Sequence, residues 1–241
     1  MRILRYALMP LAFGLALIMI WLASRPGPAP DGPIASPVSE AQAIDGDTLQ
    51  IGGQIVHLFG IIAPELGQRC MHDNVWSRCG QDAAYELNKM IGVSQVPLRC
   101  TIVDNNEPSP AATCMAGQTD VAHALLTGGY VAAAADASPQ YREAEAEASR
   151  AGLGIWHSQF VNPADWRAGK RLPGSENADM DPCPIKATVT AQGDRLFLVP
   201  TDAGYQSVVT DPARGERLFC TVEAARAAGW HHPGEIRDRN N

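Results

Sequence analysis

The spacing of apolar side chains changes several times along the chain, and each spacing predicts a different element. Residues 48–58 alternate apolar and polar side chains around a Gly-Gly pair, which predicts a β-hairpin with a two-residue turn. Residues 80–91 repeat apolar side chains every three or four positions, which predicts a helix. The stretches 96–103 and 112–115 predict two strands.

The next segment carries explicit helix boundaries. A helix is predicted from Asp120 to Leu126, followed by a strand at Tyr130–Ala132. Ser138 and the proline after it are typical of a helix start, and this helix should stop at Gly152. Its glutamates at 143, 145 and 147 indicate a solvated face.

Residues 161–182 are polar and contain prolines, so we expect a connector. After it, strands at 185–191 and 196–200 and a helix at 222–228 predict a small β-rich module. Residues 236–241 should form a disordered tail. His231 and His232, close to that tail, are expected to be exposed.

The N-terminal segment predicts export. Residues 6–23 are apolar and are preceded by Arg2 and Arg5, which favours a transmembrane helix with the N-terminus in the cytoplasm. A cleaved signal peptide is the alternative, and it exports the remainder equally well. The Pro/Gly-rich stretch 24–40 is expected to be a linker, with order beginning near Ala41.

Charge and composition narrow the class of partner. An apolar content of 46% and a charged content of 19% are ordinary for a globular protein. The net charge of −7 comes from residues 41–160, which carry 6 basic and 13 acidic side chains. This acidic surface makes nucleic acid an unlikely partner, since it repels phosphates.

The cysteines also favour an oxidising compartment. There are six of them: Cys70, Cys79, Cys100, Cys114, Cys183 and Cys220. Their order favours three local loops, 70–79, 100–114 and 183–220, among the many possible pairings. A metal site of Cys70, His72 and Cys79 is the competing interpretation, although the chain has no CxxC pair and such thiols oxidise outside the cytoplasm.

Two motifs at a fixed spacing carry a family resemblance. Asp45-Gly-Asp-Thr48 is followed after the hairpin by His57-Leu-Phe-Gly-Ile-Ile-Ala-Pro-Glu65. Together with Gly128-Gly-Tyr130 and Gly152 to Trp156, they make residues 41–157 resemble the staphylococcal thermonuclease family. The resemblance implies a five-stranded OB-fold barrel with three helices. The cysteine placement is similar to exported bacterial members, some of which are associated with exopolysaccharide synthesis.

The family cleaves phosphodiesters with calcium, and the resemblance assigns roles to residues of this chain. Asp47 matches a metal-binding aspartate and Asp45 its neighbour, while Glu65 matches the glutamate that orients or deprotonates water. Three matches are lost: His57 stands for one phosphate-binding arginine, Ile62 for the second metal aspartate, and the region of Ser109 for the second arginine. The family's threonine, which binds through its backbone oxygen, is Ala63 here.

The missing cations decide the functional prediction. No lysine or arginine occurs in residues 26–68 or 100–141, so no shift of alignment supplies either arginine. A lost electrostatic donor commonly costs roughly 10²–10³ in rate, and a histidine is mostly neutral at pH 7. We therefore expect a non-catalytic binding or accessory protein without a cofactor. A calcium-dependent nuclease of DNA or RNA with an atypical site is the alternative.

These expectations combine into one organisation. We predict an α+β protein: a membrane anchor or signal at 1–23, a linker at 24–40, a thermonuclease-type OB-fold at 41–160, a connector at 161–182, a module at 183–232 and a tail at 233–241. The module resembles a small domain appended to exported thermonuclease-like proteins. We expect the chain in the bacterial inner membrane, with its main domains periplasmic and a larger membrane complex as partner.

Overall fold

A computed structural model describes residues 34–36, 41–52, 54–93, 97–105, 110–175 and 183–237. All of them belong to one compact unit, Pro33–Asn241. The expected membrane segment 1–23 and Ser109 lie outside the described residues. Within the described ranges, no helix has the length and apolar character needed to cross a bilayer.

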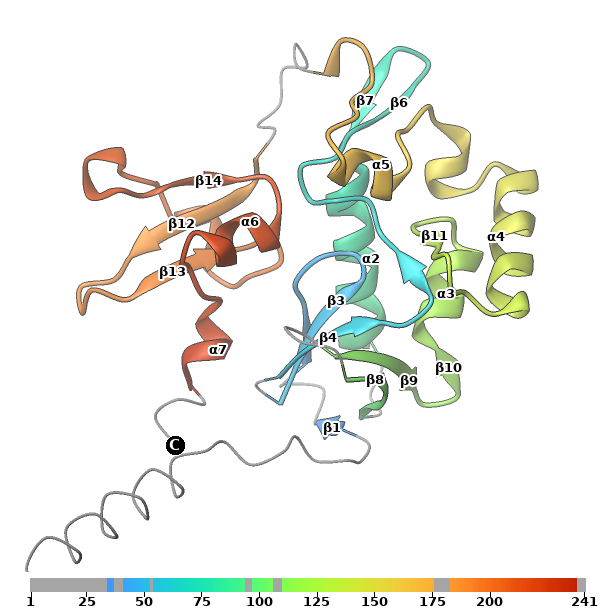
Figure 1. Ribbon diagram of the computed structural model, residues 1–241, viewed down its shortest axis with the longest axis horizontal. Coiled ribbons are helices and arrows are strands. Elements are labelled where there is room, and N and C mark those ends of the chain that lie inside the picture. The colour runs from blue at the N-terminus through green and yellow to red at the C-terminus, as the bar shows by residue number, and fades with distance from the viewer. Residues whose placement is uncertain are drawn as a thin grey trace, which may run out of the picture. The chain divides into compact units, whose positions relative to one another are not determined.

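A curled sheet forms the larger part of this mixed α+β fold (Figure 1). The strand order is β1-β8-β9-β4-β3-β2, and β10 pairs with β9. The bounds are β1 Ile34–Ser36, β2 Ala41–Ala43, β3 Thr48–Ile51, β4 Gln54–Leu58, β8 Leu98–Asp104, β9 Ala111–Ala116 and β10 Thr119–Asp120. β4 and β9 run parallel, and the other neighbours are antiparallel.

The predicted hairpin is present as β3 and β4, with Gly52 in a left-handed conformation (φ 54°) that favours glycine in the turn. β1 lies inside the stretch expected to be a linker, where it pairs with β8. The strand expected at Tyr130–Ala132 is shorter and later, because only β11 (Ala132–Ala133) pairs with β5 (Ile61–Ile62).

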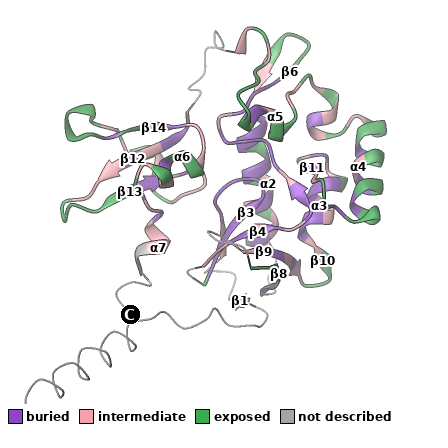
Figure 2. Cartoon of the chain, in the orientation of Figure 1, coloured by how far each residue is buried: buried purple, intermediate pink, exposed green. Residues whose placement is uncertain are grey.

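Three helices are present where their sequence patterns predict them: the first two pack on the curled sheet, and the third packs on the second helix and on β11. They are α2 (Cys79–Val93), α3 (Val121–Thr127) and α4 (Pro139–Ala151). The Asp120 and Ser138 side chains accept backbone N–H groups at the starts of α3 and α4, and Gly152 ends α4 in the left-handed conformation. Figure 2 shows the outer face of α4 exposed, as its glutamates indicate.

A second, three-stranded sheet follows in the order β13-β12-β14. Its elements are β12 Ile185–Val189, β13 Arg195–Leu198, β14 Arg217–Phe219, α6 Val222–Ala227 and α7 Pro233–Arg237, with 3-10 turns η4 Tyr205–Ser207 and η5 Pro212–Arg214. The buried Glu216 carboxylate accepts the N–H groups of Val189 and Asp211 and the Thr188 hydroxyl, which joins β12 to the turn before β14.

The two sheets share an apolar cluster. Ile44, Leu66 and Ala84 from the first half pack with residues of the second sheet and its helix, including Phe197 and Trp230. All five side chains are buried, so this contact is part of the core of the unit.

His232 is buried, and the expectation that it is exposed is wrong. Its side chain is 3% exposed. Nδ1 lies 2.6 Å from Gln50 Oε1, and Nε2 lies 2.9 Å from Asp202 Oδ1. Gln42 also donates to the Asp202 carboxylate. The position of His232 near the chain end does not indicate this network, because the other members of the network come from β2, β3 and the turn after β13.

The three disulfides are those expected: Cys70–Cys79, Cys100–Cys114 and Cys183–Cys220. The first fastens the hairpin of β6 (Cys70–His72) and β7 (Val75–Ser77) to the start of α2. That hairpin was not expected from the sequence. Its turn uses Asp73 and Asn74 at positive φ, and its three-residue strands are too short to show an alternation.

Candidate functional site

The turn after β2 carries two buried aspartates, Asp45 and Asp47. The Asp47 N–H donates to Asp45 Oδ1 at 3.0 Å, which fixes the turn internally. Gly46 between them leaves no room for a side chain, since a Cβ there would lie 2.7 Å from the Cβ atoms of Ala63 and Ala83. The turn is therefore pressed against β5 and α2, and the glycine is required by that close approach.

Asp47 joins the two sequence motifs directly. Its Oδ2 accepts the backbone N–H of Ala63 at 2.6 Å, and its Oδ1 accepts the Thr48 hydroxyl at 3.2 Å. Ala63 contributes its N–H in this contact. The two motifs thus meet through a buried, charge-assisted hydrogen bond.

The backbone of Glu65 lies against the first turn of α2. A Cβ at Gly80, in the first turn of this helix, would lie 1.7 Å from the Glu65 carbonyl oxygen. The same carbonyl accepts the Gln68 N–H at 2.7 Å, while the Gln68 side chain accepts the Glu65 N–H. These backbone contacts hold Glu65 in place, and its side chain is only 4% exposed.

An arginine from a distant segment occupies this site. Arg167 ends the short helix α5 (Pro163–Arg167), whose first turn is capped by Asn162. Its Nε donates to Glu65 Oε1, and its Nη2 lies 3.7 Å from Asp47 Oδ2. One guanidinium therefore contacts both carboxylates, which places Asp47 and Glu65 on the same side of the fold.

This cation is the functional residue that sequence reasoning missed. The gaps in lysine and arginine are real, but they constrain only the stretches that match the family motifs. Arg167 belongs to the region expected to be a connector. The sequence Asn162-Pro163 is a recognisable helix start and could have predicted α5. Nothing in the local pattern indicates that this helix ends beside Glu65.

The other predicted positions are less directly involved. His57, on β4, places Nδ1 3.0 Å from the Thr48 hydroxyl, so a single hydroxyl separates it from Asp47. Ile62 lies on β5 opposite Ala132, where it offers no oxygen. Ser109, at the position of the second family arginine, lies outside the described residues.

The electrostatic balance of the site is set by burial. Burial, and after it repulsion from Asp47, raises the pKa of Asp45 to about 6. Burial also raises the pKa of Glu65, although the Arg167 guanidinium offsets part of that effect. Burial disfavours the charged form of Arg167, yet Glu65 and Asp47 outweigh it and raise its pKa. Glu223, in the first turn of α6, adds negative charge nearby.

Comparison with known proteins identifies a relative. No protein-family model matches the chain. The succinoglycan biosynthesis protein ExoI of Rhizobium meliloti (strain 1021) is 32% identical over 145 residues, which cover 58% of this chain and 75% of ExoI. The chain belongs to the ExoI family. Asp45, Asp47, Glu65 and Arg167 therefore form the candidate site of an ExoI-family protein.

The arrangement in this ExoI-family chain does not fit a calcium ion. Calcium takes roughly 6–8 oxygen ligands. Asp47 already accepts two hydrogen bonds, Glu65 binds a guanidinium, and Ile62 has no oxygen to offer. A fixed positive charge 3.7 Å from Asp47 Oδ2 also opposes a second cation. Within the described ranges, no three His, Cys, Asp or Glu side chains gather as a possible metal site.

Proposed function

We propose that the chain is an extracytoplasmic, thermonuclease-like OB-fold protein that does not cleave phosphodiesters and serves as a binding or accessory subunit in polysaccharide synthesis. The observation that carries this proposal is the Arg167 guanidinium on Glu65 and beside Asp47. The carboxylate that would orient or activate water is engaged by the chain's own cation.

The strand pairing supports the OB-fold part of the proposal. An OB-fold is a five-stranded, partly open Greek-key barrel. Here β2, β3 and β4 form a meander, β4 runs parallel to β9, and β9 returns antiparallel to β8. Helices α2, α3 and α4 correspond in number and order to the three helices that the thermonuclease resemblance implies.

Charge supports the non-catalytic part. Among the described residues, Glu65, Asp47 and Glu223 act on the Arg167 guanidinium and Asp45 acts on Glu65, so these four acids outnumber the one cation that contacts Glu65. A phosphodiester carries negative charge and would be repelled before any bond is made or broken. The acidic side chains that dominate residues 41–160 act in the same direction.

The ExoI family and the disulfides support the proposed role in polysaccharide synthesis and the proposed extracytoplasmic location. ExoI is a succinoglycan biosynthesis protein by name, and this chain covers 75% of it. Three disulfides are typical of an exported protein, because cytoplasmic thiols stay reduced. We place the chain in the periplasm, anchored to the inner membrane by residues 1–23 and attached to a larger membrane complex.

Arg167 also gives a second candidate function a physical basis. Its side chain is 44% exposed, so it could supply one of the positive groups that a phosphodiester transition state requires. In that case the chain is a nuclease in which Arg167 replaces a family arginine. The guanidinium would have to leave Glu65 to release that carboxylate for water.

A nuclease assay on the purified full chain distinguishes the two candidates. We expect no cleavage of single-stranded DNA, double-stranded DNA or RNA with calcium at pH 7. Cleavage that disappears in Glu65→Gln would refute the non-catalytic proposal. If Arg167→Gln also abolished it and Arg150→Gln did not, the second candidate would hold, since the partner of Arg150 among the described residues is Glu147 on the exposed face of α4.

The accessory role has its own test in the source organism. Removing the protein should lower polysaccharide output, and a folded Glu65→Gln variant should restore it fully, because no carboxylate chemistry is required. A Glu65→Gln variant that folds and accumulates normally but fails to restore output would contradict a non-catalytic role.

A further inference from the structure

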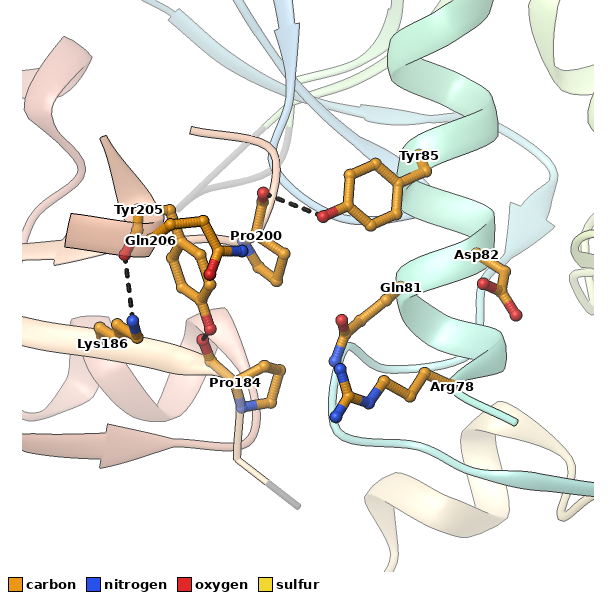
Figure 3. A pocket seen from close by; sticks show the side chains of 9 residues that line it. All are labelled: Arg78, Gln81, Asp82, Tyr85, Pro184, Lys186, Pro200, Tyr205 and Gln206. Carbon is orange, nitrogen blue, oxygen red and sulfur yellow. Dashed lines mark hydrogen bonds between the residues drawn. The ribbon is translucent and has the colours of Figure 1, made fainter. Parts of the chain in front are cut away.

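A cavity of about 380 Å³ lies between α2 and the second sheet (Figure 3), and its lining includes neither Glu65 nor Arg167. α2 and the residue before it contribute Arg78, Gln81, Asp82 and Tyr85, and the second sheet and its turns contribute Pro184, Lys186, Pro200, Tyr205 and Gln206. Its size falls within the range of small-molecule sites, roughly 300–1,000 Å³.

The walls of the cavity are held by their own hydrogen bonds. The Tyr85 hydroxyl donates to the Pro200 carbonyl at 3.2 Å, and the Tyr205 hydroxyl donates to the Pro184 carbonyl. Lys186 Nζ donates to the carbonyls of Tyr205 and Val208 at 3.0 and 2.8 Å and lies over the Tyr205 ring. The hollow is therefore preformed, which lowers the cost of binding.

Gln81 supplies an amide without a partner. The residue is 8% exposed, and no hydrogen bond of its side chain to another described residue is present. Figure 3 shows it directed from α2 toward the second sheet, beside Arg78. Among the described residues, fully buried side-chain polar atoms without a partner occur only on Trp156 and Trp230, so the polar atoms of the Gln81 amide open into the cavity, where they can bind the donors and acceptors of a ligand.

The charges of the cavity select an anion. The Arg78 side chain makes no hydrogen bond or close ion pair with another described residue, although its charge acts on Asp82 one turn further along α2, and Lys186 Nζ donates to two carbonyl oxygens. Arg78 also precedes the N-terminal end of α2, whose backbone dipoles add positive potential. The one acid of the lining, Asp82, points away from the second sheet in Figure 3.

The aromatic rings select a ligand with apolar faces as well. Tyr85 is one of the exposed large apolar side chains of the described residues, and it borders a second hollow of about 550 Å³ that extends to Tyr130 and His157. A chain-like ligand could therefore run along α2 and pass over this ring. Hydroxyl-rich rings with apolar faces suit such a combination of tyrosines and amides.

We propose that the cavity between α2 and the second sheet binds an acidic saccharide unit, with Arg78 on its carboxylate, Gln81 on its hydroxyls and Tyr85 against its ring. The negative charge of the ligand follows from the cavity, whereas its saccharide class rests on the proposed role in polysaccharide synthesis. The site is separate from Glu65 and Arg167, so the nuclease assay and the binding assay fail independently.

Calorimetric titration of the full chain tests the proposal with cellotetraose bearing succinyl half esters, unmodified cellotetraose and glucose 6-phosphate. We expect the succinylated tetramer to bind at least about tenfold more tightly than the unmodified one, and this preference to decrease at high salt. Arg78→Gln should reduce the preference about tenfold, and Gln81→Met should weaken both tetramers. The matched control Arg150→Gln should change neither.

Three results would overturn the inference. The first is equal binding, or no binding, of the two tetramers. The second is an unchanged preference in Arg78→Gln, whose exposed side chain can be removed without unfolding the protein, as a thermal melt will verify. The third is tighter binding of glucose 6-phosphate than of the succinylated tetramer, which would make the site a phosphate site.

Discussion

Arg167 determines what the residues around Glu65 can do. Its guanidinium replaces solvent and any external cation on a carboxylate that is almost fully buried. A buried charge is tolerated only when it is paired, so Glu65 and Arg167 depend on each other.

Replacing Arg167 by alanine should therefore lower the free energy of unfolding. We expect a loss of about 1–3 kcal/mol, less than for a fully buried pair because the arginine is partly exposed and screened by solvent. Urea denaturation measures it. The double variant Arg167→Ala/Glu65→Gln should recover part of the loss, and Arg150→Ala should change stability by less than about 0.5 kcal/mol. Additive losses in the double variant would show that the two residues are not coupled.

Asp45 should make stability depend on pH. Its pKa of about 6 in the folded chain exceeds the ordinary value of 3.8, so the folded state binds the proton more tightly than the unfolded state. The Asp45 contribution to stability therefore falls as pH rises from about 4 to about 6 and is level above that range, where the raised pKa of Glu65 still lowers the stability of the chain. Asp45→Asn should remove this slope and raise stability at pH 7 by on the order of 2 kcal/mol. Denaturation curves between pH 4 and pH 8 that coincide for the two proteins would contradict this.

At the scale of single residues, the sequence predicted the acidic side chains of the site but not the cation Arg167. Asp47 and Glu65 could be brought together from the motif spacing, since both motifs flank one short hairpin. Arg167 is 102 residues from Glu65, and its position depends on how α5 packs after the last predicted helix. Long-range packing of a five-residue helix leaves no periodic signal in the sequence.

At the scale of elements, α2 forms part of the Glu65 site, the acidic-saccharide cavity and the core. The helix contacts Glu65 through Gly80, places Gln81 and Tyr85 in the cavity, and buries Ala84 against the second sheet. Its existence was predictable from the apolar spacing of residues 80–91, as were the capped helices α3 and α4. β6, β7 and β14 were not, because three-residue strands are too short for an alternation to be recognised.

Alanine substitutions at two glycines of α2, Gly80 and Gly92, test how this helix packs. Gly80→Ala would press a methyl group into the Glu65 carbonyl, so we expect a loss of more than about 3 kcal/mol or failure to fold. Gly92→Ala meets nothing within 4 Å and should stabilise the helix by up to about 1 kcal/mol. Thermal melts of the two variants provide the measurement. Equal effects would mean that α2 does not lie against Glu65 as described.

At the scale of the molecule, the second sheet is fastened to the first by apolar packing and by the His232 network. His232→Leu would leave Gln50 and Asp202 without their shared partner in the core. We expect a loss of about 2–4 kcal/mol and faster hydrogen exchange in β12 and β13 than in β8 and β9. The neighbouring His231, whose side chain is 42% exposed, provides a control, since His231→Leu should cost less than about 1 kcal/mol. Uniform exchange across both sheets would contradict a role in joining them.

The last prediction concerns nuclease activity. Arg167 lies outside the stretch that resembles the thermonuclease family, so restoring the family residues does not remove it. Restoring the family pattern with His57→Arg, Ile62→Asp and Ser109→Arg returns two cations and a carboxylate, but it leaves the guanidinium on Glu65. We expect this triple variant to remain inactive with calcium at pH 7. Adding Arg167→Ala frees Glu65 and Asp47 and should produce calcium-dependent cleavage of DNA, whereas adding Arg150→Ala should not. Cleavage by the triple variant alone would show that Arg167 does not prevent catalysis. A folded quadruple variant with Arg167→Ala that still does not cleave DNA would show the same.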